Sequence, residues 1–277
     1  MTKLLAVGFA LPLLGCVVGP ESSDDTAPGG TGSIDSAVHI SGDTNAGLTY
    51  QVDKRTVVDA GATLTIPAGA TVSFAPNTSI EVRGTVKVVG EKASPVHLSP
   101  ASPGEHHYGF TVPAGGTLVM SYAVQVGGGI TANGGTVTVT DSQMSQASGD
   151  FLVVGAGTVD VSYSAIGVEP GGTDTTHCDM HFGGTGLTVK VTHSNISTSS
   201  FGLMLYGGTN VDLTYNNWFS NSTQVDTAPG VSGDVSHGWF DKSIPKAGPG
   251  AMLTANNLSG TRLPSAATDP AGGAGVR

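Results

Sequence analysis

Between Tyr50 and about residue 240 the chain is made of short apolar and polar runs that glycine and asparagine separate. Ala62–Ile66 and Thr85–Val89 are typical of these runs, because an apolar residue recurs at every second position and one face of a β-strand is therefore apolar. No stretch longer than eight residues has the apolar spacing of a helix. The pattern predicts an all-β fold built from short strands.

Five of the runs share one pattern without gaps: apolar, any residue, apolar, Ser or Thr, any residue, small residue. They begin 19, 22, 30 and 22 residues apart. The runs are Leu118–Ala123, Val137–Ser142, Val159–Ser164, Val189–Ser194 and Val211–Asn216. A solenoid explains such a repeat, because each coil buries its apolar residues against the next coil and like residues stack about 4.8 Å apart.

Two polar columns run through this repeat. Its fourth position holds hydroxyls, and its sixth position holds small, mostly polar residues: Ala123, Ser142, Ser164, Ser194 and Asn216. We expect ladders of these side chains to satisfy backbone groups at the turns. A β-sandwich is the alternative fold, although hairpins would not repeat one column so regularly.

The repeat resembles the right-handed parallel β-helix proteins of the pectate-lyase-like group. Residues 60–70, with the sequence AGATLTIPAGA, resemble the first coil of many bacterial surface β-helix modules. The resemblance implies one right-handed parallel β-helix of about seven or eight coils. Trp218 and Trp239 stand near its end, where we expect a cap over the last coil.

The start of the chain resembles the signal of bacterial lipoproteins. Lys3 precedes the apolar run Leu4–Leu14, which is too short to span a bilayer. Gly and Cys16 follow, as in a lipobox, so the resemblance implies that Cys16 is acylated and anchors the chain in a membrane. Val17 stands where an Asp favours retention in the inner membrane, so sorting to the outer membrane is expected.

Composition divides the chain into four parts. The first fifteen residues are the expected signal peptide, and residues 16–45 are rich in Gly, Ser, Thr, Asp and Pro, which predicts a flexible tether. Residues 46–260 form the predicted β-helix with its cap. Residues 261–277 are similar in composition to the tether and are expected to be a disordered tail.

Charge excludes some classes of function. Charged residues are 12% of the chain, and 11 Lys and Arg face 21 Asp and Glu, which gives a formal charge of −10. A nucleic-acid partner requires clustered cations, so none is expected. Disorder throughout the chain is excluded by the hydrophobic share of 38%.

Catalysis is disfavoured by the residues that are missing. Glycoside hydrolysis requires two carboxylates about 5 to 10 Å apart across one bond, and lyases require a strong base. The one adjacent acid pair, Asp24-Asp25, lies in the tether, and the cations of the body are scattered. We therefore predict no catalytic residues, with a polysaccharide lyase or glycoside hydrolase as the alternative.

Residues 177–181 (HCDMH) are the densest group of metal-ligand types. On a straight strand His177, Asp179 and His181 share one face, which suits Zn²⁺, while the Cys and Met on the other face suit copper. When His181 is aligned with Leu205 of the following repeat, apolar residues fall on both faces of the strand. The sequence therefore leaves open which face points inward. A histidine pair that only makes hydrogen bonds is the alternative. We predict no other cofactor.

The fifth position of the repeat holds a largely aromatic column: Tyr122, Asp141, Tyr163, His193 and Tyr215. Strict alternation would point this column inward as an aromatic stack at a corner. A bend after the hydroxyl column would turn it outward, where stacked aromatics can bind sugars. We take Tyr163, His193 and Tyr215 as candidate ligand-binding residues.

These features predict a non-catalytic lipoprotein of the cell envelope. Its lipid would bind the membrane, and its β-helix would bind a polysaccharide or an envelope protein. Because the chain is acidic, a neutral glycan is expected rather than an anionic one. A structural spacer with no ligand is the second alternative.

Overall fold

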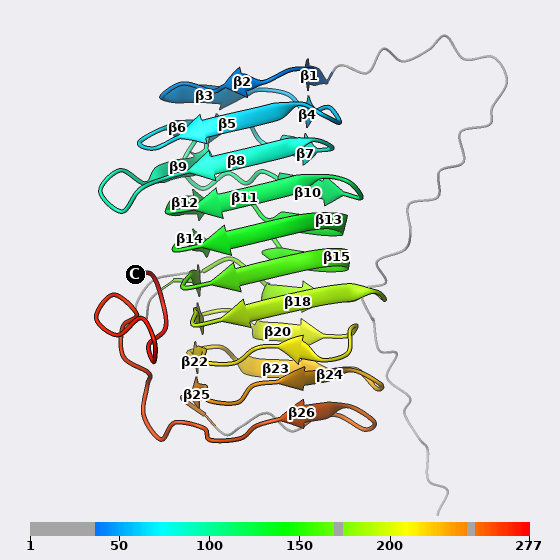
Figure 1. Cartoon of the computed structure of the whole chain (residues 1–277), viewed down its shortest axis with the longest axis vertical. Coiled ribbons are helices and arrows are strands. Elements are labelled where there is room, and N and C mark those ends of the chain that lie inside the picture. Colours follow the sequence, from blue (N-terminus) through cyan, green and yellow to red (C-terminus); the bar gives the residue numbers. More distant parts are fainter. Residues whose placement is uncertain (1–36, 169–173, 243–246) are drawn as a thin grey trace, which may run out of the picture. The chain divides into compact units, whose positions relative to one another are not determined.

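The computed structural model describes residues 37–168, 174–242 and 247–277, and its strands form a parallel solenoid (Figure 1). Each pairing between its strands is parallel, in one sheet of 17 strands and one of nine. In the described residues no helix is long and apolar enough to cross a membrane. The predicted all-β class and the parallel β-helix are confirmed.

The strands form three stacks that run along the axis of the solenoid. Stack 1 contains β1 (Val38–Ile40), β4 (Thr56–Val58), β7 (Ser79–Val82), β10 (Gly109–Pro113), the first parts of β13 (Ile130–Thr140) and β15 (Leu152–Ser162), β17 (Cys178–Phe182), β20 (Phe201–Leu205) and β23 (Thr223–Thr227). Stack 2 contains β2 (Thr44–Asn45), β5 (Thr63–Pro67), β8 (Thr85–Val89), β11 (Thr117–Ser121), the remaining parts of β13 and β15, β18 (Leu187–Thr192), β21 (Val211–Asp212), β24 (Ser232–Asp234) and β26 (Met252–Thr254).

Stack 3 is the second sheet. It contains β3 (Thr49–Val52), β6 (Thr71–Phe74), β9 (Val96–Pro100), β12 (Ala123–Val126), β14 (Gln143–Ser145), β16 (Ala165–Gly167), β19 (Asn195–Ser197), β22 (Asn217–Phe219) and β25 (Trp239–Phe240). The strands of stack 2 run from right to left at the front of Figure 1 while the chain descends, so the helix is right-handed.

The described part of the chain forms about nine coils rather than seven or eight, since stack 3 has one strand per coil. The first coil begins earlier than the predicted boundary at residue 46. Val38–Ile40 pairs with β4, and Thr44–Asn45 pairs with β5. The last residues of the expected tether are therefore strands, because their backbone groups complete the edge of the first full coil.

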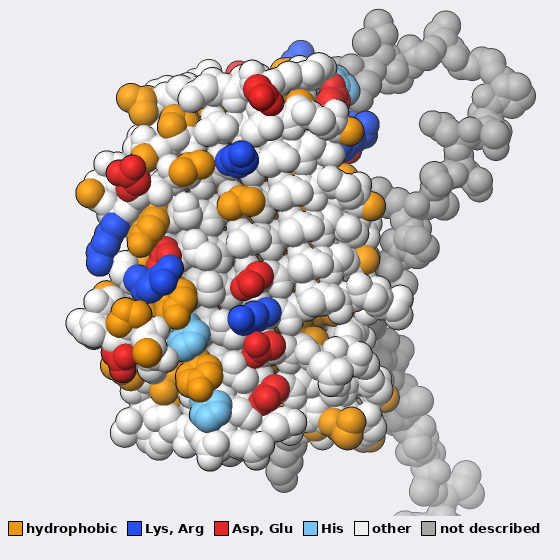
Figure 2. All heavy atoms as spheres, viewed as in Figure 1, with side chains coloured by type: hydrophobic (Ala, Val, Ile, Leu, Met, Phe, Trp, Pro, Cys, Tyr) orange, Lys and Arg blue, Asp and Glu red, His pale blue; other side chains and the backbone are white. Residues whose placement is uncertain are grey.

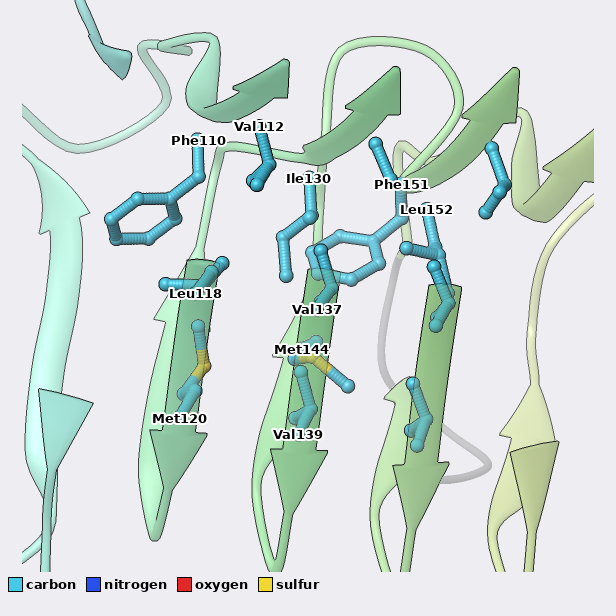
Figure 3. Packing of buried hydrophobic residues seen from close by; sticks show 14 of the residues in the cluster. Phe110, Val112, Leu118, Met120, Ile130, Val137, Val139, Met144, Phe151 and Leu152 are labelled. Atoms are coloured by element: carbon cyan, nitrogen blue, oxygen red, sulfur yellow. The ribbon is translucent and has the colours of Figure 1, made fainter. Parts of the chain in front are cut away.

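The repeat predicted from the sequence matches the pairing register of the strands in stack 2. Leu118 pairs with Val137, and Val137 pairs with Val159, as the alignment without gaps requires. The apolar positions of all three stacks point into one continuous core. Figure 3 shows Phe110, Ile130 and other buried side chains of successive coils meeting there. A single coil would have no core of its own, because its apolar side chains are buried only by the coils stacked on either side of it.

The sixth position of the repeat lies in the turn from stack 2 to stack 3, and we name Ser142, Ser164, Ser194 and Asn216 the turn column. The Ser164 hydroxyl donates to the Ser162 carbonyl at 2.9 Å and accepts from the Ser142 backbone N–H at 3.2 Å. Ser142 and Ser194 make the same two kinds of bond. The predicted ladder is confirmed at this position, and all four side chains are completely buried.

The outer face of stack 2 is smooth and mostly uncharged (Figure 2). Four of its charged side chains form a short row along the axis, because Asp160 pairs with Lys190, Lys190 with Asp212, and Asp212 with Asp234. Lys87, on β8, is a further charged side chain of this face. Beside the row runs a column of threonines: Thr63, Thr85, Thr117, Thr136, Thr158 and Thr188. This face offers mostly small polar groups along β11, β13 and β15.

Candidate functional site

The fifth column of the repeat points out of the solenoid. Its backbone is left-handed, with φ of 50° at Tyr163, 52° at His193 and 60° at Tyr215, and the same bend occurs at His237. We name these four residues the aromatic column. Their rings stack with centroids 4.9, 4.7 and 4.7 Å apart. Because the faces of the inner rings already contact each other, a sugar ring has no free aromatic face there.

Residues 261–277, which we name the C-terminal segment, contact the body of the β-helix. The Tyr163 hydroxyl donates to the Pro270 carbonyl at 3.0 Å, and His193 Nδ1 donates to the Gly273 carbonyl at 2.9 Å. The expected disordered tail is thus ordered in the structure. The polar edges of the aromatic rings supply donors that its composition could not reveal.

An ion pair completes this contact. The Arg277 guanidinium donates to both carboxylate oxygens of Asp141, at 2.8 and 2.6 Å, and lies 4.0 Å from the centroid of the Tyr163 ring. Asp141 is 4% exposed, so its carboxylate has a charged partner where water is excluded. The hydrogen bonds raise the pKa of Arg277 further above its ordinary value.

A cavity of about 710 Å³ lies between the C-terminal segment and the outer face of stack 3. Its floor consists of outward side chains from β12 to β22, and its roof comes from the C-terminal segment. The lining residues are Val124, Val126, Gln143, Ser145, Ala165, Gly167, Val168, Asn195, Ser197, Asn217, Arg262, Leu263, Ser265, Ala274, Gly275 and Val276. The volume falls within the range of pockets that hold small ligands.

The cavity combines amides with small apolar groups. Gln143, Asn195 and Asn217 contribute amides from three of four consecutive coils, and Ala165 occupies the same position on the coil between Gln143 and Asn195. The Asn217 side chain accepts from the Leu263 backbone N–H at 2.9 Å and donates to Asn195 at 2.9 Å, so it also holds the roof in place. Arg262 is the one charged residue among the described lining residues.

The cluster at 177–181 does not lie on a straight strand. In β17, β20 and β23 two consecutive residues are buried at the second and third positions, namely Asp179-Met180, Gly202-Leu203 and Gln224-Val225. A side chain added at Gly202 would meet the buried Trp218 ring, so the second position also faces inward. Asp179 therefore does not share a face with His177 and His181.

The register of this region differs by one residue from the alignment made on sequence. His181 pairs with Met204, and Phe182 pairs with Leu205. The Cys178 Sγ lies 3.0 Å from the Met204 Sδ, which places the sulfur of β17 beside the sulfur of the next coil.

The carboxylate that joins the two histidines is Asp150, from the turn before β15. Its Oδ1 lies 3.0 Å from His177 Nδ1, and its Oδ2 lies 2.8 Å from His181 Nδ1. The Cys178 Sγ lies 3.1 Å from His177 Nδ1. Ligand atoms of Asp150, His177 and Cys178 all lie within 4.8 Å of one another.

The electrostatics of the two carboxylates differ. Burial acts to raise the pKa of Asp150, but hydrogen bonds from His181, His177 and Cys178 outweigh it and lower the pKa to about 2. Burial, with the nearby charge of Asp174, raises the pKa of Asp179 well above its ordinary value. The Ser199 side chain and the Ser197 backbone oppose this rise, but neither makes a well-formed hydrogen bond to an Asp179 oxygen. Asp150 is thus an anion near the histidines, whereas burial favours the neutral form of Asp179.

Sequence reasoning missed Asp150 and Met204 as members of this group. The repeat held the necessary signal, because Leu152 pairs with Met180 and Asp150 therefore stands beside Cys178 on the preceding coil. The inward orientation of Asp179 could not be predicted in this way, because the inward residues Asp179 and Gly202 are not apolar and the sequence pattern therefore does not show the break in alternation. Cys16 lies outside the described residues.

No protein-family model matches the chain, and no curated protein or solved structure matches it. The fold is therefore established by the structure alone.

Proposed function

We propose that this protein is a binding module of the cell envelope, anchored through Cys16, whose ligand site is the cavity beneath the C-terminal segment. The cavity is the single observation that carries the proposal: it is large enough for a short stretch of an extended chain molecule and is lined by amides from three coils. The lipobox-like start of the chain supports the location at a membrane.

The lining chemistry favours a neutral glycan. Amide groups donate to and accept from sugar hydroxyls, and Val124, Ala165 and Leu263 offer apolar contact for the faces of sugar rings. The net charge of −10 opposes binding of strongly anionic polymers. Successive coils place the side chains of the floor about 4.8 Å apart along the axis, so the cavity extends in the direction of an elongated ligand.

The same lining favours binding over turnover. None of the described residues around the cavity is a carboxylate, a histidine or a lysine, so the cavity lacks the acid pair of a hydrolase, and Arg262 is the one strong base there that a lyase could use. A lyase or hydrolase of the pectate-lyase-like group remains the alternative activity to be tested against this proposal.

The test is a screen of the purified protein against neutral and acidic polysaccharides. Ala165→Trp fills the cavity from its floor, and Thr136→Trp adds the same ring to the exposed face of stack 2 as the matched control. We expect binding of a neutral glycan that Ala165→Trp weakens at least tenfold and Thr136→Trp leaves unchanged.

Two results would contradict the proposal. Equal binding by both tryptophan variants would show that the ligand binds outside the cavity. Release of reducing ends or unsaturated products by the wild-type protein, abolished by replacing one Asp or Arg of the body, would make the protein an enzyme.

A further inference from the structure

The group around Cys178 brings two soft sulfur donors together with an imidazole and a carboxylate. Three strands or turns of stack 1 contribute to it, on a side of the solenoid separate from the cavity. Its atoms are the Asp150 carboxylate, the His177 imidazole, the Cys178 thiol and the Met204 thioether. We propose that these four side chains bind one copper(I) ion.

Three of the distances between these atoms are slightly shorter than those in a coordination shell. His177 Nδ1 lies 3.1 Å from Cys178 Sγ and 3.0 Å from Asp150 Oδ1, and Cys178 Sγ lies 3.0 Å from the Met204 thioether. Bonds of about 2.0 to 2.3 Å in a tetrahedral site place neighbouring ligand atoms about 3.3 to 3.8 Å apart. Movements of roughly half an ångström would therefore admit an ion among these groups.

The sulfur atoms decide which ion fits best. Thiolate and thioether ligands are soft, and together they select copper(I), whereas zinc sites use thiolate, imidazole and carboxylate. Cys178 is completely buried. Binding replaces the thiol proton with the metal and releases that proton to solvent, with no change in oxidation state.

The surroundings orient the ligands and border them with aromatic rings. The His181 Nδ1 bonds to the Asp150 carboxylate at 2.8 Å, which makes His181 a positioning residue for Asp150. The Tyr206 ring packs edge-on against His181, and the Phe201 ring lies 5.4 Å from His177, so aromatic rings border the group.

Solvent reaches the group from two directions. The His177 side chain is 52% exposed. A hollow of about 350 Å³, lined by Tyr108, Ser148 and others, ends at Asp150. An ion can therefore enter without unfolding of the coil.

The test uses the reduced full chain carrying Cys16→Ser, which retains Cys178 as its one thiol. Anaerobic titration with copper(I) against the chromophoric competitor bicinchoninate measures stoichiometry and affinity. We expect one copper(I) per chain. Adding Cys178→Ser should lower the affinity at least a hundredfold, and Asp150→Asn about tenfold, because each removes a ligand.

Met204→Leu is the decisive variant, since it conserves volume and should fold as the parent does. We expect it to lower copper(I) affinity about tenfold and to leave zinc affinity unchanged. Met144→Leu, in the core away from the group, is the matched control and should change neither. Thermal unfolding of each metal-free variant checks its fold. Copper(I) should raise the unfolding midpoint of the parent, and it should raise the midpoint less in a variant that lacks a ligand.

The proposal is overturned by fewer than half an equivalent of copper(I), or by parental affinity in the Cys178→Ser chain. Retention of bound zinc(II) against equimolar copper(I) would overturn the choice of copper. These results are independent of glycan binding, because the site and the cavity share no residue.

Discussion

Two regions of this solenoid bury polar side chains, with opposite results. In the turn column, Asn216 donates to the carbonyls of Val191 and Leu213 and accepts from the Ser194 backbone N–H. In β17, Asp179 is equally buried, yet neither of its oxygens has a hydrogen-bond partner. A turn offers unpaired backbone groups to a side chain, whereas a strand has already used its own in the sheet.

The comparison shows that burial alone does not reveal the contribution of a polar side chain to stability. The turn column lies where successive coils each leave a backbone N–H or carbonyl without a strand partner. Asp179 is inward because its strand breaks the alternation, and the nearest donors, on Ser197 and Ser199, make no well-formed hydrogen bond to its oxygens. The first arrangement stabilises the fold and the second destabilises it.

Removing a hydrogen-bonded side chain of the turn column should have the largest effect on stability. We expect Asn216→Ala to lower the free energy of unfolding by about 3 to 4 kcal/mol, because it leaves a buried N–H and two buried carbonyls without their partners. Urea unfolding followed by circular dichroism measures the change. Asn133→Ala, at an exposed position, is the control and should cost less than about 0.5 kcal/mol. A loss that small at Asn216 would mean that water replaces its bonds.

A third buried polar group, His107, sharpens the comparison because it is satisfied only when neutral. Its Nε2 donates to the Val126 carbonyl at 3.1 Å, and its Nδ1 accepts from the Gly109 N–H at 3.1 Å. Burial lowers its pKa from 6.5 to about 4. The unfolded chain therefore binds the proton first as the pH falls, so stability is lost between about pH 6.5 and pH 4.

We expect this loss to reach about 3 kcal/mol at pH 4, which is the shift in pKa expressed as free energy. Unfolding at a series of pH values in wild type and His107→Gln measures it, and the variant should lack this part of the slope. His97→Gln, at an exposed position of β9, should keep the wild-type slope. An unchanged slope in His107→Gln would assign the pH dependence to other groups.

The smallest effect on stability is expected at Asp179, and it should be opposite in sign. Replacing Asp179 with Val, which has a similar volume, removes a carboxyl without hydrogen bonds from the interior. We expect a gain of about 1 to 2 kcal/mol in the free energy of unfolding. Asp160→Val, on the outer face of β15, should change stability by less than about 0.5 kcal/mol. Destabilisation by Asp179→Val would show that its carboxyl finds a donor in solution.

The sequence by itself determined the class of fold and much of its register. Apolar residues at every second position require a buried strand face, and the columns from Leu118 to Val211 can repeat only if coils stack in parallel. The hydroxyls of the turn column follow from the same repeat. These features depend on local spacing, and nearest-neighbour coils in a solenoid convert that spacing directly into contacts.

Only the tertiary structure decided the outcome at the two candidate sites. The inward rotation of Asp179 depends on a break in alternation shared by three coils, and the role of Asp150 depends on which turn lies above β17. The docking of the C-terminal segment joins Arg277 to Asp141, 136 residues earlier in the chain. The bend at Asp179 and the docking of Arg277 depend on contacts that residue spacing does not encode, whereas the place of Asp150 beside Cys178 follows from the repeat once the register of β15 and β17 is known.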